Sequence, residues 1–150
     1  MRILAVDPGT FAGFAYTDTA RVEPTSSGVW NLEPRRGEGW GRRFTRLREY
    51  LDGVAPDRLV WEDVRGHKGT EAAHLYGGYV ATLLTWCEDH GAPYSSLPVW
   101  KIKQVATGKG NANKAAMIHA AARRWGDVTS GDRADALWIL EAYLREKAGL

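Results

Sequence analysis

The chain has 150 residues, of which 44% are hydrophobic and 25% charged, a balance typical of one folded globular domain spanning 1–150. This length excludes two full-sized domains. No apolar stretch is long enough to span a membrane and no secretory leader is evident, so we expect a cytoplasmic protein without membrane association. The formal net charge is only +2, and the single cysteine, Cys87, excludes an internal disulfide and a cysteine-based metal site.

Four short apolar runs in the first 61 residues predict strands of a sheet. The first run, 2–6, ends at Asp7, where Asp-Pro-Gly predicts a turn. Two aromatic and β-branched stretches, 14–17 and 28–32, predict an antiparallel hairpin beside the first strand. The fourth run, 58–61, follows a helical segment, so we expect it to pair in parallel with the first strand.

Helical patterns fill most of the remaining chain. Apolar side chains in 39–51 recur three and four positions apart, which predicts an amphipathic helix with its arginines facing outward. A long helix over 70–89 contains Gly77 and Gly78. Because each glycine costs a helix about 1 kcal/mol relative to alanine, we expect another helix or a partner subunit to approach closely there. The later elements complete a mixed sheet flanked by helices: a strand over 93–97, and helices over 98–105, 114–125 and from Ser130 or Asp132 to about 147.

Basic residues are concentrated in two segments although the total charge almost balances. Six arginines and one acid lie between Arg35 and Arg48, and Arg42 and Arg43 are among them. The segment 90–126 contains no acidic residue but carries six lysines and arginines. Each run alone fits a solvated helix face, whereas two in one small chain favour a polyanionic partner.

Four carboxylates fall where a sheet edge and a helix start could meet. Asp7 ends the first strand and Glu62 ends the strand expected beside it, and ligands of open α/β sheets bind at that edge. Side chains alternate along a strand, so at most one of Glu62 and Asp63 joins Asp7. Asp132 and Asp135 share one face of the last helix because they lie three positions apart. Carboxylates without histidine or cysteine favour Mg²⁺ or Mn²⁺, although each acid alone also fits a turn, a strand end or a helix start.

Four blocks of the sequence together resemble the RuvC family of Holliday-junction resolvases. They follow the family's order and span nearly the whole chain: Ile3-Leu4-Ala5-Val6-Asp7-Pro8-Gly9-Thr10, Val60-Trp61-Glu62-Asp63-Val64, Ile102-Lys103-Gln104-Val105 through Gly108-Lys109-Gly110-Asn111-Ala112-Asn113-Lys114, and Asp132-Arg133-Ala134-Asp135-Ala136-Leu137. The resemblance implies an RNase H-like α/β fold, in which a five-stranded mixed sheet is flanked by helices. It implies four metal ligands, Asp7, Glu62, Asp132 and Asp135, and two lysines that assist DNA binding and catalysis, Lys103 and Lys114.

The resemblance implies an endonuclease that resolves four-way DNA junctions by symmetric nicks leaving 5′-phosphates. We expect two divalent ions, Mg²⁺ or Mn²⁺, at the four carboxylates, with Lys114 offsetting charge on the phosphate. A junction has approximate two-fold symmetry, so we also expect a homodimer. The long helix is the candidate interface through Tyr76, Tyr79, Leu83 and Trp86, and packing of these residues in the chain's own core is the alternative.

Basic and polar residues outside the carboxylates are candidate contacts to branched DNA. Lys109 lies between two glycines without the full spacing of a phosphate loop, so we interpret its loop as DNA-facing rather than ATP-binding. Bacterial family members carry an aromatic residue three positions after the glutamate, where this chain has Arg65, and we therefore expect junction opening to depend on charge. The chain is also shorter than those members, which favours a compact, phage-type version. The DNA-binding candidates are Lys103, Lys109, Lys114, Arg65, His67, Lys68, Arg42 and Arg43.

Three other functions stay open at this point. A YqgF-like or other RNase H-like nuclease acting on RNA would use the same carboxylates. A non-catalytic junction-binding module would bind junctions without cutting them. An actin-like phosphotransferase begins with a similar acidic, glycine-containing loop, but such enzymes close two large lobes around ATP, which a chain of 150 residues does not provide.

Overall fold

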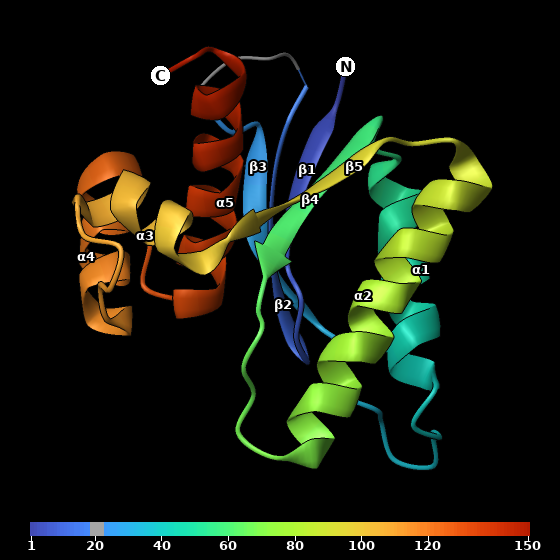
Figure 1. The fold of residues 1–150 in the computed structure, drawn as a ribbon. Helices are drawn as coiled ribbons and strands as arrows, with labels where there is room; N and C mark the ends of the chain where they lie inside the picture. The colour runs from blue at the N-terminus through green and yellow to red at the C-terminus, as the bar shows by residue number, and fades with distance from the viewer. Residues whose placement is uncertain (19–22) are drawn as a thin grey trace.

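The computed structural model describes residues 1–18 and 23–150, and in these ranges it contains five strands and five helices (Figure 1). The elements in chain order are β1 (Ile3–Asp7), β2 (Phe11–Thr17), β3 (Ser26–Asn31), α1 (Arg42–Val54), β4 (Arg58–Asp63), α2 (Thr70–His90), β5 (Tyr94–Pro98), α3 (Val99–Thr107), α4 (Lys114–Trp125) and α5 (Gly131–Lys147).

The strands form one mixed sheet in the order β3-β2-β1-β4-β5. β1 pairs antiparallel with β2 and β2 antiparallel with β3, which confirms the predicted hairpin. β1 pairs in parallel with β4, and β4 in parallel with β5, as expected for strands joined through helices. Because Val6 lies opposite Trp61, the next residues of these two strands, Asp7 and Glu62, reach the same edge of the sheet.

Helices cover both faces of the sheet: α1 and α2 lie on one side, and α3, α4 and α5 on the other (Figure 1). Side chains of β1 alternate between these two layers. Ile3 and Ala5 pack with α5, whereas Leu4 and Val6 pack with α1 and α2. Asp7 continues the alternation of Ile3 and Ala5, so it belongs on the side of α5.

Predicted and observed elements agree in type and differ mainly at their ends. β2 begins at Phe11, three residues earlier than expected, and α1 begins at Arg42, three residues later. Glycine is unfavourable inside helices, and α1 starts directly after Gly41. Local caps hold the last two helices: the Asn113 side chain accepts a hydrogen bond from the Ala116 N–H, and Ser130 accepts one from the Arg133 N–H.

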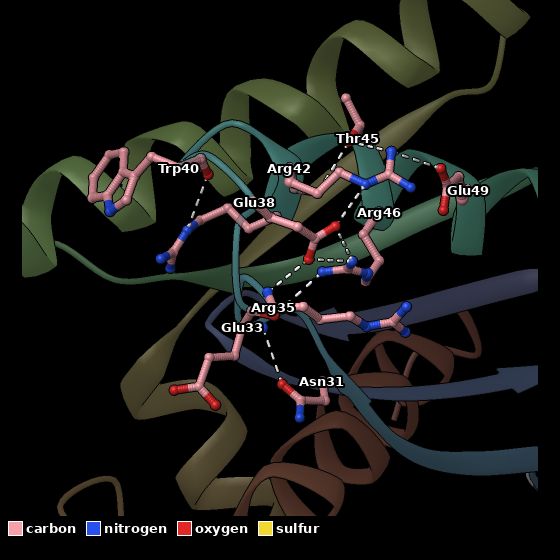
Figure 2. Close-up of polar contacts among 10 residues, drawn as sticks. Asn31, Glu33, Arg35, Glu38, Trp40, Arg42, Thr45, Arg46 and Glu49 are labelled. Atoms are coloured by element: carbon pink, nitrogen blue, oxygen red, sulfur yellow. Dashed lines mark hydrogen bonds and ion pairs between the residues drawn. The ribbon is translucent and has the colours of Figure 1, made fainter.

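The outward orientation predicted for the arginines of α1 is wrong at two positions. Arg43 and Arg46 are only 8% and 6% exposed. Arg46 donates to both carboxylate oxygens of Glu38 at 2.8 Å, and Arg42 donates to the same carboxylate at 3.1 Å (Figure 2). Hydrogen bonds from Arg46, then from the Arg35 backbone N–H and from Arg42, lower the pKa of Glu38 to about 2. The segment before α1 thus folds back and neutralises part of the first basic run.

The face of α2 expected at a dimer interface lies inside the chain's own core. Three of its four residues are almost fully buried with α1 and the sheet: Tyr79, Leu83 and Trp86. A Cβ atom at Gly78 would lie 2.4 Å from the ring of Phe44 in α1, whereas one at Gly77 would meet nothing. The expected close approach of another helix is therefore confirmed for Gly78, and the interface assignment is corrected in favour of intramolecular packing.

Cys87 is buried in the same layer, and burial raises the pKa of its thiol to about 11, as fits an unreactive core residue. Over 1–18 and 23–150, no helix combines the length and apolar character needed to cross a membrane.

Candidate active site

Three parts of the fold bring the predicted site residues to one edge of the sheet. The parallel strands β1 and β4 end there with Asp7 and Glu62. The first turn of α5 adds Asp132 and Asp135. β5 ends beside β4 at the same edge and leads directly into α3, which carries a lysine, and α4 begins with another: Lys103 and Lys114.

A glycine in β2 lets α5 reach Asp7. Gly13 lies opposite Asp7 in the β1–β2 ladder. A Cβ atom at Gly13 would lie 1.8 Å from the carbonyl oxygen of Asp132, which no side chain tolerates. Because Gly13 has no side chain, the backbone of the first turn of α5 rests on β2 directly beside Asp7.

The carboxylates share one electrostatic neighbourhood. Burial, and then the negative charges of Asp135, Glu62 and Asp132, raise the pKa of Asp7 well above its ordinary value, while Lys114 opposes the shift. Burial and Asp135 raise the pKa of Glu62 to about 7. Burial also raises the pKa of Asp135 to about 6, against the lowering effect of Lys114. Such a cluster carries negative charge that its lysines only partly compensate.

The donor chemistry fits a hard divalent cation, because all four groups offer carboxylate oxygens. The ligand set is not assembled in advance: among residues 1–18 and 23–150, no three aspartate, glutamate, histidine or cysteine side chains stand in an arrangement that could hold an ion. Like charges favour separated rotamers in the absence of a counter-ion. A divalent ion would offset the repulsion among these carboxylates.

A cavity of about 280 Å³ opens at this edge of the sheet. Its charged wall consists of two carboxylates and two lysines, and three apolar residues complete the lining: Glu62, Asp135, Lys103, Lys114, Val64, Val99 and Met117. Asp7 and Asp132 are not part of this lining, but Asp135 and Glu62 of the cavity raise the pKa of Asp7, and Asp132 raises the pKa of Asp135. Lysines beside carboxylates suit a phosphate group, because the lysines can stabilise its negative charge while the carboxylates can hold a metal ion.

Two supporting residues of this edge were not expected from the sequence. The Tyr76 hydroxyl donates to the Glu62 carbonyl at 2.8 Å and accepts from the Val64 N–H at 3.0 Å, which holds the end of β4. A Cβ atom at Gly131 would lie 2.3 Å from Cε of Lys114, so this lysine lies across the first residue of α5. A glycine inside a strand, such as Gly13, indicates from sequence that another backbone approaches closely. A glycine at a helix start, such as Gly131, gives no such indication.

Four of the remaining DNA-binding candidates lie on loops and do not line the carboxylate cavity: Arg65, His67, Lys68 and Lys109. Asp63 turns away from Glu62 and pairs with Arg65 at 3.1 Å, as alternation along the strand requires. His67 and Lys68 are exposed between β4 and α2, and Lys109 is exposed between α3 and α4.

The two arginines of α1 are less available than expected. Arg42 is half-exposed and pairs with Glu38 and Glu49 (Figure 2). Arg43 is buried and donates to Thr10 Oγ1 at 3.2 Å and to Tyr79 Oη at 3.1 Å. A guanidinium held in this way is not available at the surface, so the expectation that Arg43 contacts DNA is corrected.

Proteins of known name resemble this chain in sequence and in fold. No protein-family model matches it. The crossover junction endodeoxyribonuclease RuvC of Halorhodospira halophila is 31% identical over 117 residues, which cover 75% of this chain and 70% of the relative. The enzyme of the same name from Dehalococcoides mccartyi is 30% identical over 119 residues, covering 76% and 71%. T. thermophilus RuvC in complex with a Holliday junction substrate superposes with a TM-score of 0.79 at 20% identity, covering 99% of this chain and 96% of the other.

Proposed function

We propose that this chain, which belongs to the RuvC family of crossover junction endodeoxyribonucleases, resolves four-way DNA junctions by nicking two strands at symmetric positions. The observation that carries the proposal is the convergence of four carboxylates and two lysines at one edge of the sheet. The fold neighbour bound to a Holliday junction supports branched DNA as the substrate.

Nucleases of this family are metal-dependent. We assign the ligand role to Asp7, Glu62, Asp132 and Asp135, and we propose two Mg²⁺ or Mn²⁺ ions. The chemistry that such a pair supplies is activation of the attacking water and stabilisation of the leaving oxygen. An attack that expels the 3′-oxygen leaves the phosphate on the 5′ end.

The two lysines of the cavity have separate roles in this proposal. Lys114 lies across Gly131 and lowers the pKa of Asp7 and of Asp135, so it favours their ionised forms and places a positive charge beside the scissile phosphate. Lys103 lowers the pKa of Glu62 and of Asp135 and contacts the DNA backbone next to the cut. Both lysines stabilise the negative charge that develops on the phosphate during the reaction.

Contacts farther from the cut are proposed for the exposed side chains around the edge of the sheet. Arg65, Lys68 and Lys109 carry positive charge on the loops after β4 and α3, and the side chains of His67 on the first of these loops and of Arg42 on α1 add polar contacts. Such contacts bind phosphates without reading sequence.

A homodimer remains part of the proposal because two matched cuts require two active sites. Sedimentation or light scattering of the protein tests this oligomeric state. We also propose the cytoplasm as the place of action.

The decisive experiment compares three labelled substrates with and without Mg²⁺: a four-way junction, a linear duplex of the same sequences and a structured RNA. Paired nicks in opposite strands of the junction alone are the expected result. Cleavage of the RNA alone would favour the nuclease that acts on RNA, and binding of the junction without any nick would favour the non-catalytic module.

A further inference from the structure

An exposed tryptophan lies on the first turn of α3, next to the carboxylate cavity but outside its lining. The side chain of Trp100 is 58% exposed, more than any other large apolar side chain of residues 1–18 and 23–150 except the two chain ends. Val99 before it and Lys103 one turn later both line the cavity. Nothing in the proposed hydrolysis uses this indole.

The loop after α3 brings a lysine onto the same surface. Trp100, Lys103 and Thr107 lie three and four positions apart and so form one strip of the helix. The Thr107 hydroxyl donates to the Lys103 carbonyl at 2.9 Å and accepts from the Lys109 N–H at 3.1 Å, which ties the loop to the end of this strip. The loop then folds back: a Cβ atom at Gly110 would lie 3.3 Å from the carbonyl oxygen of Trp100 and 3.5 Å from its Cβ. Lys109, the neighbour of Gly110, therefore lies on the surface that carries Trp100.

The fold gives Trp100 no partner, unlike the other exposed tryptophan. Trp40 contacts the ring of Phe44 edge-on, and the guanidinium of Arg43 lies over its own ring. Within 1–18 and 23–150, no ring or cation stacks on Trp100 and no acceptor receives its indole N–H. Such a side chain leaves apolar area in water that folding does not use, so its position indicates a ligand outside the chain.

The charge around Trp100 suits a nucleic acid better than an apolar protein surface. The segment 90–126 contains no acidic residue and six lysines and arginines. Lys101 is paired with Glu146 at 2.7 Å, whereas Lys109 forms no ion pair with a carboxylate of residues 1–18 and 23–150. A free lysine attracts a phosphate, and an indole beside it offers a face on which a base can stack.

We propose that Trp100 stacks on a base whose face is open at the branch point of the junction, while Lys109 contacts a neighbouring phosphate. The inference rests on the proposed junction cleavage and assigns Trp100 to the recognition of branched DNA. Inside a linear duplex each base is covered on both faces by its neighbours. At a branch point the stacks of the arms are interrupted, so a base can present a free face. Stacking on an aromatic side chain tolerates every base, so this contact favours branched DNA without reading sequence.

The first test measures binding in EDTA to a four-way junction and to a linear duplex with the same ends. We expect Trp100→Ala to bind the junction about tenfold more weakly and the duplex as the unmodified protein does, and Trp100→Phe to retain most of the junction affinity. Lys109→Gln should instead weaken both complexes, because both DNAs offer phosphates. Unchanged junction binding by Trp100→Ala, or an equal loss on both DNAs, would overturn the proposal.

Trp40→Ala is the matched control for this test. It removes the other exposed indole, which packs against α1, and should change neither affinity. We expect Trp100→Ala to fold, because alanine keeps the Cβ atom against which Gly110 lies. Circular dichroism checks this.

The second test locates the contact in the unmodified protein and decides alone if Trp100→Ala does not fold. Junctions with a single 5-iodouracil close to the branch point are bound in EDTA and irradiated, and the cross-linked peptide is identified by mass spectrometry. We expect a base at the branch point to cross-link to Trp100, and the same base within a linear duplex not to do so. Cross-links that avoid Trp100 from every position would contradict the assignment.

The outcomes separate this inference from the function on which it rests. A protein that prefers junctions and cuts them, yet binds them equally well as Trp100→Ala, retains the proposed function and loses only the stacking residue. A change of molar mass in light scattering for Trp100→Ala, with unchanged DNA affinity, would assign the indole to a contact between copies of the chain and overturn the proposal. A protein with no preference for junctions over linear duplex would refute both.

Discussion

Gly13 of β2 lies directly against the carbonyl oxygen of Asp132, 119 positions further along the chain, so closely that an added Cβ atom would be 1.8 Å from it. Gly13 is also the ladder partner of Asp7. One position without a side chain therefore sets the distance between the carboxylate of β1 and those of α5.

Gly13→Ala is expected to push the start of α5 away from β2. Overpacking of this kind costs about 1–3 kcal/mol of unfolding free energy, and cutting should fall more than junction binding because the carboxylates separate. Thermal unfolding and paired-nick assays measure the two effects. Gly77→Ala is the control, since a Cβ atom there meets nothing and a helical alanine is about 1 kcal/mol more favourable than glycine. Unchanged cutting by Gly13→Ala would contradict this role.

Asp7→Asn should bind junctions but cut them at least about 100-fold more slowly, because groups that merely support metal ligands already contribute about 10- to 100-fold. The same change should raise the melting temperature in EDTA at pH 8, since it removes one of several mutually repelling charges. Asp63→Asn is the matched control: its carboxylate pairs with Arg65 at the surface, so cutting should persist. A melting temperature lowered by Asp7→Asn would show that this group stabilises the fold.

The metal-free protein should lose stability as the pH rises from about 4 to about 7. The folded-state pKa values of Glu62 and Asp135 are raised to about 7 and about 6, so the folded state binds more protons than the unfolded state across this window. Their stabilising contribution is complete below the unfolded-state pKa values and disappears above the folded-state ones. Melting curves in EDTA at several pH values measure the slope, and Glu62→Gln should flatten it.

Mg²⁺ should stabilise the protein more at pH 8 than at pH 5, because at the lower pH the ion competes with protons for the carboxylates. Melting temperatures with and without Mg²⁺ at both pH values test this. The opposite order would argue against carboxylate ligands at this edge of the sheet.

Lys114→Gln should move the pH profile of cutting upward, because Lys114 lowers the pKa of Asp7 and of Asp135. Lys109→Gln is the matched control, since Lys109 is exposed on a loop and does not line the carboxylate cavity. That variant should weaken binding and reduce its salt dependence without shifting the profile. An unshifted profile for Lys114→Gln would remove Lys114 from the site.

Much of the site followed from local rules applied to the sequence. Asp7 and Glu62 were expected together because parallel neighbours end at the same edge, and the register of β1 and β4 confirms it. Asp132 and Asp135 were expected on one face because helical spacing is fixed. Asn113 predicted the start of α4 because a cap acts within one turn.

Packing between distant segments decided the rest. Arg43 belongs to a run that reads as a solvated face, but its buried contacts come from Thr10 and Tyr79, more than 30 positions away on either side. Tyr79, Leu83 and Trp86 fit an interface or a core equally well by spacing, and only the position of α1 assigns them to the core.

The sequence by itself thus determined the order and type of the elements and the acidic residues at their ends, since hydrophobic period, caps and turns act over a few residues. Tertiary structure alone decided how closely α5 approaches β2 and which arginines are buried. These depend on the shapes of side chains brought together from far apart in the chain, for which local sequence carries no period and no cap.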